Sequence, residues 1–295
     1  MLQRLSAIGS QPAYRSKDRM KMLIGALSAP SATRSWLDFM DATPFLQRAL
    51  QHQPKLITKI YRPYLSTGWG CADRVQVIQT HYRIAQDLGL GPLLDQAMSA
   101  PQLIYQGLTK SEAPFELRLS ASDQGHREGE MCLSLIYQGH SLFELNCTLG
   151  EADGQRCLRV GRLQGTSQEQ AQQWVRQATG DFHACRPANL MLHAVRNLAA
   201  IWQCTSVLLI SNRLRIALNW WRRRHITANY DKTWIEAGAL LRADGWYCLP
   251  PLAEKDIDLS EIASKKRAEA KRRQALLNGI YSGLSEHLNT WKAKA

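Results

Sequence analysis

Short apolar segments that alternate with polar residues fill the chain between residues 102 and 165, and they limit the fold more than any other feature of the sequence. In residues 115–119, phenylalanine and leucine occupy every second position, which is typical of a strand with one buried face. Gln138-Gly139-His140 and Asp153-Gly154 are turn signals of the kind that join neighbouring strands. The stretch therefore predicts an antiparallel meander.

Helical spacing of apolar residues replaces this alternation on both sides of the meander. Before it, residues 72–88 form the clearest predicted helix. After it, Ser167-Gln168-Glu169-Gln170 resembles a capping box, which predicts a helix over residues 168–178 with Ser167 as its cap. A further helix is predicted to extend from Pro187 to about residue 203, because proline favours the first turn of a helix.

The stretch from Ser206 to Leu249 is predicted to organise a site. Residues 207–210 are apolar and include β-branched side chains, as in a buried strand. A short helical pattern over residues 232–241 and a second strand over residues 246–249 follow. Ligands in folds that contain a sheet gather at strand ends and helix starts, so a crevice is expected here.

Together these patterns predict an α+β protein in three parts. A helical region covers residues 1–100, a mixed sheet with flanking helices covers residues 101–252, and a basic helix lies within residues 253–295. A chain of 295 residues with 45% hydrophobic content is long and apolar enough to bury a sizeable core.

The formal net charge of +12 and the pI of about 9.5 favour anionic partners such as nucleic acid, lipid headgroups, phosphorylated cofactors or acidic proteins. Within residues 264–273 the positive charges wrap around a predicted helix. The side chains expected to bind an anionic surface there are Lys265, Lys266, Arg267, Arg272 and Arg273. A solvated helix packed on the domain explains the same charges, and the aromatic residues typical of single-strand nucleic-acid binding are absent from it.

The cysteines and the apolar runs bear on where the chain resides. The seven cysteines are scattered without a C-x-x-C pair, which indicates reduced thiols rather than a disulfide framework or a zinc site. No apolar run reaches the roughly 18 residues of a spanning helix. The apolar stretch 22–27 is shorter than the about 7–15 residues of a secretory signal core. We expect a cytoplasmic protein, with a peripheral position at the inner membrane as an alternative.

Two places suit a phosphate or another polar ligand group. Arg186-Pro187 begins a helix, where free N–H groups and the helix dipole favour an anion and the guanidinium matches a phosphate or carboxylate. An arginine paired with a surface carboxylate is the alternative. Gln164 and Gly165 end a predicted strand, where the glycine would let a ligand approach and the amide offers a donor and an acceptor. A plain turn is the alternative explanation of Gly165, because glycines mark turns by default.

The side chains of catalytic type lie after the organising strand. Tyr230, Asp231 and Glu236 are candidates for proton transfer, and Asn212 and Trp234 for ligand contacts. Asp231 also suits the N-cap of its own helix, and a tryptophan is more often part of a core. The histidines show no metal-ligand spacing, and no HExxH, GxSxG, P-loop or GxGxxG motif occurs.

Several short motifs resemble those of the VirK/YbjX family, a bacterial family whose defining domain has no known function. They are His81-Tyr82, the EGE at 128–130, the VGRLQG at 160–165, Arg186-Pro187, Ser211-Asn212, the NYDKTW at 229–234, Glu236, the GWYCLP at 245–250 and the SKKRAEAKRR at 264–273. The resemblance covers roughly residues 30 to 285 and rests on the order and spacing of these motifs. It implies a Gram-negative source and a role in virulence, antimicrobial-peptide resistance, envelope or lipid A stress, and the response to DNA damage.

A second resemblance concerns the order of elements, which is similar to that of GNAT-type acyltransferases. Two functions are therefore expected from the sequence. The first is a stress-associated protein that acts by binding through its basic surface. The second is an acyltransferase with an acyl-CoA or acyl-carrier-protein donor, in which Arg186 holds phosphate, Gln164 and Asn212 orient the reacting groups, and Tyr230 or Asp231 moves the proton. No cofactor is established by either interpretation.

Overall fold

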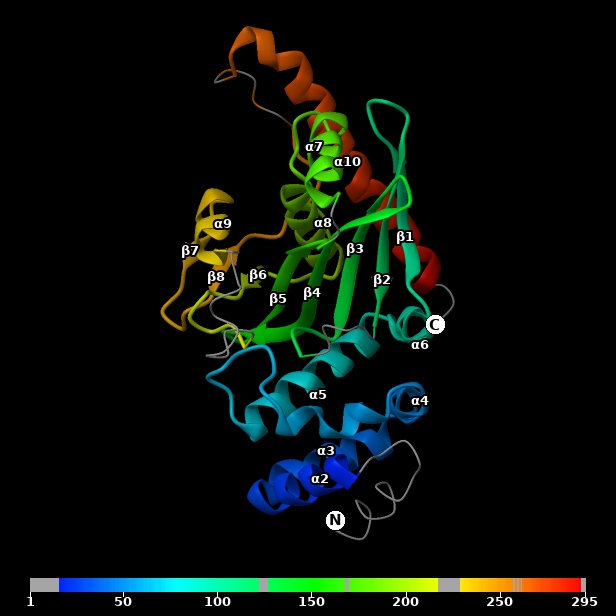
Figure 1. Ribbon diagram of the computed structural model, residues 1–295, viewed down its shortest axis with the longest axis vertical. Helices are drawn as coiled ribbons and strands as arrows, with labels where there is room; N and C mark the ends of the chain where they lie inside the picture. Colours follow the sequence, from blue (N-terminus) through cyan, green and yellow to red (C-terminus); the bar gives the residue numbers. More distant parts are fainter. Residues whose placement is uncertain are drawn as a thin grey trace.

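The structure, a computed structural model, describes residues 16–121, 127–167, 170–216, 229–256, 258, 260 and 262–292. Within these ranges eight strands form one mixed sheet in the order β1-β2-β3-β4-β5-β6-β8-β7 (Figure 1). The strands are β1 (Gln102–Leu108), β2 (Pro114–Ser120), β3 (Met131–Tyr137), β4 (His140–Ala152), β5 (Gln155–Gly165), β6 (Ser206–Leu209), β7 (Leu240–Leu241) and β8 (Tyr247–Leu249). The predicted α+β class and the mixed sheet are confirmed.

The first five strands are the predicted meander, because each pairs antiparallel with the next. β5 and β6 pair in parallel, and the helices α7 (Ala171–Asp181) and α8 (Pro187–Ile201) make the crossover between them. β8 then pairs with both β6 and β7, so the last strand lies between its two predecessors. Parallel neighbours need such a crossover, whereas antiparallel neighbours need only a hairpin.

Helices of the N-terminal region gather at one end of the sheet (Figure 1). They are α2 (Ser16–Ser28), α3 (Pro30–Ala42), α4 (Pro44–His52), the 3-10 helix η1 (Pro54–Tyr61), α5 (Cys71–Asp87) and α6 (Gly91–Ser99). Of these, α5 contacts β4 and thereby joins the helical region to the sheet. The remaining helices are α9 (Tyr230–Glu236) and α10 (Ser264–Lys292), and the predicted C-terminal helix is confirmed.

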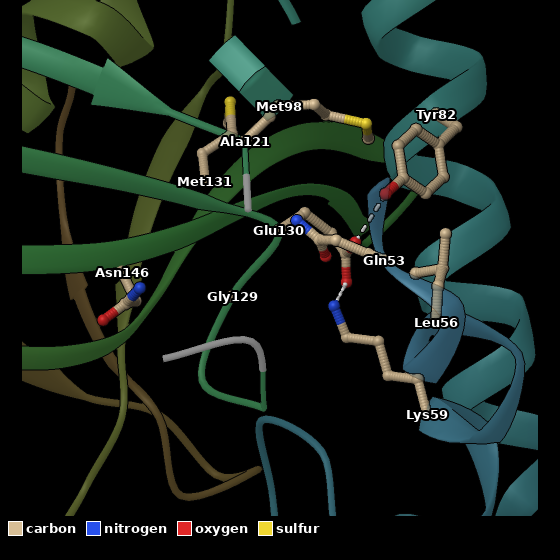
Figure 2. Close-up of a pocket in the computed structure, with 10 residues that line it drawn as sticks. All are labelled: Gln53, Leu56, Lys59, Tyr82, Met98, Ala121, Gly129, Glu130, Met131 and Asn146. Atoms are coloured by element: carbon tan, nitrogen blue, oxygen red, sulfur yellow. Dashed lines mark hydrogen bonds and ion pairs between the residues drawn. The ribbon is translucent and has the colours of Figure 1, made fainter. Parts of the chain in front are cut away.

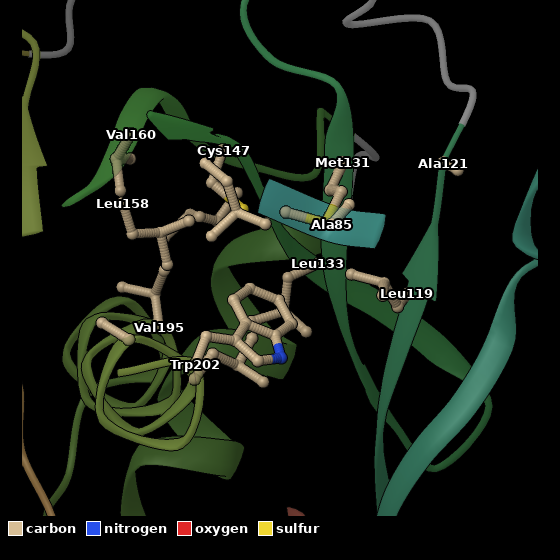
Figure 3. Packing of buried hydrophobic residues seen from close by; sticks show 14 of the residues in the cluster. Ala85, Leu119, Ala121, Met131, Leu133, Cys147, Leu158, Val160, Val195 and Trp202 are labelled. Atoms are coloured by element: carbon tan, nitrogen blue, oxygen red, sulfur yellow. The ribbon is translucent and has the colours of Figure 1, made fainter. Parts of the chain in front are cut away.

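One core runs from the N-terminal helices through the sheet, and part of it lies between the sheet and α8. Leu158 and Val160 of β5 are fully buried, and Leu158 points toward Val195 of α8, near Trp202 (Figure 3). α10 extends this layer because it contacts both α8 and β1. Among the described residues, no helix is both long and apolar enough to cross a membrane.

Three local predictions were wrong. α7 begins at Ala171 with Gln170, and not Ser167, as its N-cap. The cap of α9 is Asn229, whose side chain accepts from Lys232 N, rather than Asp231. The same helix ends at Glu236 instead of residue 241. Gly238 adopts a left-handed conformation, with φ of +80°, which ends the helical hydrogen bonding.

Candidate functional site

A β-bulge at Gly161 shapes the surface where the sequence motifs meet. The pairing of β4 with β5 shifts between Asn146 and Cys147, so that Cys147 pairs with Val160 and Asn146 with Arg162. Gly161 is the extra residue. A Cβ there would overlap the carbonyl oxygen of Glu128, because the segment before β3 crosses the sheet at this point. Only glycine fits this crossing.

The bulge decides which way the end of β5 points its side chains. Val160 faces α8, and strict alternation would turn residue 162 to that face too (Figure 3). After the extra residue, Arg162 instead lies on the face with Glu128, with 3.6 Å between its Nε and Glu128 Oε2. Its Nη1 lies 3.5 Å from Glu144 Oε2, and its Nε donates to Gln164 Oε1 at 2.9 Å. A β-bulge thus re-aims an arginine into a carboxylate cluster.

Glu128 is the carboxylate of this cluster best suited to proton transfer. Its side chain is 17% exposed, and burial raises its pKa, while the charges of Arg162, Arg215 and Arg127 oppose that rise. A carboxyl group with a raised pKa can act as an acid as well as a base near neutral pH. Glu128 and Arg162 lie in the EGE and VGRLQG motifs, but no local sequence pattern predicts a role for either residue.

The Tyr230 corner closes the gap that opens where β5 and β6 separate. The Tyr230 hydroxyl donates to Leu163 O at 2.8 Å and accepts from Leu163 N at 2.9 Å. These backbone groups lie on the β6 side of β5, where no strand pairs at that level, since the pairing with β6 ends at Val160. The guanidinium of Arg215 covers the ring, 3.7 Å from its centroid, and burial raises the Tyr230 pKa.

Asn212 holds this corner together. Its backbone N donates to Asp231 Oδ1 at 2.8 Å, its Nδ2 donates to Asn229 Oδ1 at 2.8 Å, and its Oδ1 accepts from Tyr230 N at 3.1 Å. The structure therefore brings together Asn212, Tyr230 and Asp231, as expected, and engages each in hydrogen bonds within the protein.

Trp234 and Glu236 leave the corner on different sides of α9. Trp234 is fully buried, and its Nε1 donates to Ile210 O at 2.8 Å. Glu236 has a side chain that is 58% exposed and lies 3.9 Å from Lys232. Gln164 is exposed, while Gly165 contacts the ring of Phe143. The single crevice expected from the sequence is thus divided between a buried packing side and an open side.

Arg186 and Pro187 belong to a second place, at the start of α8. Arg186 is the exposed N-cap and Pro187 the first helical residue. α10 passes nearby, because Arg273 Nη1 donates to His183 O at 3.4 Å. The pKa of His183 is lowered by burial and by the charges of Arg272, Lys110 and Arg273, against the opposite effect of Glu269. Basic groups from separate elements thus gather at this helix start.

The first half of α10 projects beyond the rest of the protein, whereas its second half packs on α8 and β1 (Figure 1). Residues 263–269 are all exposed, and among the predicted basic residues Lys265, Lys266, Arg267 and Arg272 are exposed while Arg273 is half-buried. Ile280, Leu284 and Leu288 are fully buried and hold the second half. The packed half therefore presents the basic half to solvent.

A sealed charged network lies under β4, where the N-terminal helices meet the sheet (Figure 2). Lys59 Nζ lies 2.5 Å from Glu130 Oε1, and the Tyr82 hydroxyl donates to Glu130 Oε2 at 2.7 Å. Both charged side chains are almost fully buried, 4% and 1% exposed, and the cavity beside them holds only about 10 Å³. Tyr64 extends the network, with 3.0 Å between its hydroxyl and Thr148 Oγ1.

His81 provides a hydrogen-bond acceptor for β4 beyond the point where β3 pairs with it. β3 begins at Met131, opposite Cys147, so β4 continues past it without a partner on that side. The N–H of Leu149 there donates to His81 Nδ1 at 3.2 Å. Burial lowers the pKa of His81 to about 4, and Glu130 raises it only in part, so the imidazole is neutral at pH 7. Burial alone would raise the pKa of Glu130, but Lys59 and His81 lower it below its usual range.

Comparison with known proteins places these motifs in a family. A family model described as "Protein of unknown function (DUF535)" matches residues 12–286. The uncharacterized protein YbjX of Escherichia coli (strain K12) is 29% identical over 273 residues, which cover 90% of this chain and 82% of YbjX. An uncharacterized protein of Haemophilus influenzae is 28% identical over 285 residues, 93% of this chain and 94% of the relative.

A further relative is named "Membrane protein LapB", from Mannheimia haemolytica. It is 27% identical over 186 residues, which cover 59% of this chain and 78% of LapB. The predicted resemblance to the VirK/YbjX family is confirmed by these matches. No solved structure matches the chain significantly.

Proposed function

The chain belongs to the DUF535 family of proteins of unknown function, and from this premise we propose that it binds anionic phospholipid surfaces through the projecting half of α10. The observation that carries the proposal is the exposure of that half. Residues 264–273 contain six lysines and arginines against one glutamate, and the segment extends away from the packed protein (Figure 1). The start of α8 with Arg186 adds charge where α10 reaches the body.

Electrostatic attraction to anionic headgroups would supply the affinity of this segment for a membrane. A basic residue near an anionic membrane contributes about 1 kcal/mol, provided that it lies within a Debye length of the surface. The side chains of Lys265, Lys266 and Arg267 are exposed, so they can approach headgroups, and Arg267 also donates from its Nε to Ile262 O at 2.9 Å. Binding of this kind is reversible and sensitive to salt. The relative named a membrane protein supports a location at an envelope surface.

The resemblance to the VirK/YbjX family gives this binding a biological setting. The family's links to virulence, antimicrobial-peptide resistance and envelope or lipid A stress fit a protein that adsorbs to an anionic membrane. The link to the DNA damage response fits nucleic acid as the alternative anion. A vesicle assay with single-stranded DNA as a competitor distinguishes the two.

The test is sedimentation with vesicles of phosphatidylglycerol or of phosphatidylcholine over a series of salt concentrations. We expect binding to the anionic vesicles only, and a loss of roughly 100-fold when Lys265, Lys266 and Arg267 are all changed to Gln, since three charges contribute about 3 kcal/mol. Unchanged binding by this triple variant, or equal binding to both kinds of vesicle, would reject the proposal.

α2 provides the matched control, because it is the competing surface at the opposite end of the long axis (Figure 1). Four large apolar side chains are exposed along it, at spacings of three and four residues: Met20, Leu23, Ile24 and Leu27. Lys17, Arg19 and Lys21 flank them and are exposed. The double variant Leu23→Ser/Ile24→Ser should leave binding intact if α10 is the contact. Loss of binding in this variant would transfer the membrane contact to α2.

An acyltransferase is the second candidate, favoured by the strand order. The chain order of the meander, α8, β6, α9 and β8 follows the order of elements predicted by analogy with GNAT-type enzymes. In the sheet, β5 and β6 pair in parallel, and β8 lies between β6 and β7. Glu128 and the Tyr230 corner supply groups for proton transfer near the separation of β5 and β6. An acyl-CoA or acyl-carrier-protein donor would lie with its phosphates at Arg186.

Thermal unfolding with CoA, acetyl-CoA, a long-chain acyl-CoA and an acyl-carrier protein tests this candidate. A donor at 100 times its Kd adds about 2.7 kcal/mol to stability. We expect such a shift to disappear with Arg186→Ala. Tyr230→Phe offers an independent check, since it frees Leu163 N–H and C=O for a donor arm and should strengthen donor binding. No stabilisation by any of these donors would reject the acyltransferase hypothesis.

A further inference from the structure

The loop before α5 and the turn before β8 place two tryptophans over the sheet. Trp69 and Trp246 stack with ring centroids 6.0 Å apart and an angle of 26° between the rings. The turn is fixed by Gly245, with φ of +86°, and by the N–H of Trp246, which donates to Asp244 Oδ1 at 3.1 Å. Between the rings and the sheet lies an open pocket of about 330 Å³. This volume lies within the range of small-ligand sites.

The floor of this pocket is an arginine that belongs to the sheet. Arg159 lies on β5, paired with Leu208 of β6, and only 9% of it is exposed. Its guanidinium carbon lies 5.9 Å from the centroid of the Trp69 ring. Gly150 on the neighbouring strand leaves the necessary space, since a Cβ there would overlap Arg159 Nη1. Strand, glycine and tryptophan thus hold the guanidinium in one position.

The charge of this arginine is not compensated within the described part of the chain. Its Nη2 donates to the carbonyl oxygen of Glu151, and no carboxylate there forms an ion pair with it. Asp244 lines the same pocket, but its carboxylate accepts from Arg242 Nε at 3.2 and 3.3 Å. A buried cation without a counter-ion is costly, because its hydration is lost and no opposite charge replaces it. Such a group is retained where an anion from outside completes it.

We infer that this pocket, defined here by Trp69, Arg159 and Trp246, is a binding site for a small organic anion with a flat aromatic body. The guanidinium presents paired N–H donors that match a carboxylate. The two indoles offer flat apolar surfaces on which an aromatic group stacks. One positive charge on the floor matches a single negative charge on the ligand. The inference is independent of the membrane surface on α10, which lies on another element.

The experiment uses the full-length protein and four probes. Binding of 1-naphthoate is measured by isothermal titration calorimetry against 1-naphthylmethanol, which lacks the charge, and acetate, which lacks the rings. 1-Naphthyl phosphate distinguishes a phosphate from a carboxylate as the preferred anion. We expect saturable binding of 1-naphthoate, and binding weaker by roughly 10- to 100-fold for the alcohol, because a charge-assisted hydrogen bond is lost. Acetate should not bind measurably.

Variants assign the binding to the pocket. Arg159→Met should weaken 1-naphthoate binding by a similar roughly 10- to 100-fold without lowering Tm, and Trp69→Ala should also weaken it. Trp174→Ala is the matched control, since Trp174 stacks on His140 with centroids 4.1 Å apart and does not line the pocket. If Arg159→Met fails to fold, Arg159→Lys takes its place. It keeps the charge but loses the paired N–H donors, so it should bind 1-naphthoate with intermediate affinity.

Three results would overturn the inference. Equal binding of 1-naphthoate and 1-naphthylmethanol would show an apolar site without anion recognition. A lowered Tm of Arg159→Met with unchanged 1-naphthoate binding would make Arg159 a structural residue. No saturable binding of either naphthyl anion to the wild-type protein would exclude the proposed ligand class.

Discussion

Two buried charged residues, Glu130 and Arg159, both neighbour Thr148 of β4, and they differ in how their charges are compensated. Glu130 faces Lys59 across 2.5 Å, in a network that continues to Thr148 on β4. Thr148 is the direct cross-strand neighbour of Arg159 on β5, which has no ionic partner among the described residues. The cavity beside the Glu130–Lys59 pair has a volume of about 10 Å³, whereas Arg159 lines an open pocket of about 330 Å³.

The difference separates a charge that serves folding from one that serves binding. A paired charge in a closed cavity has its counter-ion within the chain. Removal of one member therefore leaves the other buried without compensation and lowers the stability of the protein. An unpaired charge in an open pocket lacks a counter-ion that a ligand from solution can supply. Neither burial nor residue type distinguishes the two cases. The partner and the access to solvent do.

Removal of Glu130 should have the largest effect on stability. Glu130→Gln leaves the Lys59 ammonium buried without a counter-charge, and such a change costs about 3–5 kcal/mol. Urea unfolding at pH 7 measures the loss. The double variant Lys59→Met/Glu130→Gln should recover part of it, because no uncompensated charge remains. Additive losses in the double variant would show that the two side chains do not act as a pair.

The stability of the protein should depend on pH, because the buried network contains titratable groups. Burial and Lys59 hold the pKa of His81 at about 4 in the folded protein, below its usual value near 6.5. The unfolded chain therefore takes up a proton first, and stability falls as the pH drops from about 6.5 to about 4. The lowered pKa of Glu130 adds a loss at lower pH, as the pH falls through its folded pKa.

The variant His81→Gln isolates this effect. A shift of this size corresponds to at most about 3 kcal/mol, which should vanish from the pH dependence of the variant between pH 6.5 and 4. His193, whose pKa burial and Arg196 also lower to about 4, remains in the variant and is the internal control. Urea midpoints at several pH values provide the measurement. Identical pH profiles for the variant and the wild type would contradict the assignment.

Tyr82→Phe tests a weaker member of the same network. Its hydroxyl donates to Glu130 Oε2 at 2.7 Å in a buried site, and a hydrogen bond to a charged group contributes about 1.5–3 kcal/mol. We expect a loss in this range by thermal or urea unfolding at pH 7. Tyr61→Phe removes another tyrosine hydroxyl of the helical region, one that meets the neutral Thr33 Oγ1 at 2.8 Å, and should cost less.

The sequence predicted the parts of this arrangement that depend on near neighbours. Alternation over residues 102–165 indicated the meander, and Pro187 indicated the start of α8, because both signals lie within the element itself. The cap of α9 was assigned to Asp231 instead of Asn229. Both residues have a side chain of the right chemistry, and only the backbone conformation at Asn229 decides between them.

What the sequence did not reveal depends on contacts between distant segments. Lys59 meets Glu130 only because η1 lies under the sheet, and nothing near either residue indicates the pair. Arg162 faces Glu128 because Gly161 forms a bulge, and a carbonyl from a segment more than 30 residues earlier leaves room only for glycine at this position. Trp69 and Trp246 lie far apart in the sequence, and no local pattern indicates that their rings stack.

The smallest effect on stability is expected from Arg159→Met, and it is the result that separates the two regions most clearly. The variant loses one hydrogen bond, to Glu151 O, and with it a contribution of about 1 kcal/mol. It also removes the cost of a buried charge and keeps an apolar side chain of similar length against Trp69. These terms oppose each other, so the free energy of unfolding should change by less than about 1 kcal/mol. A loss as large as that of Glu130→Gln would place Arg159 in the same structural class as the sealed network, and the contrast between the two charges would disappear.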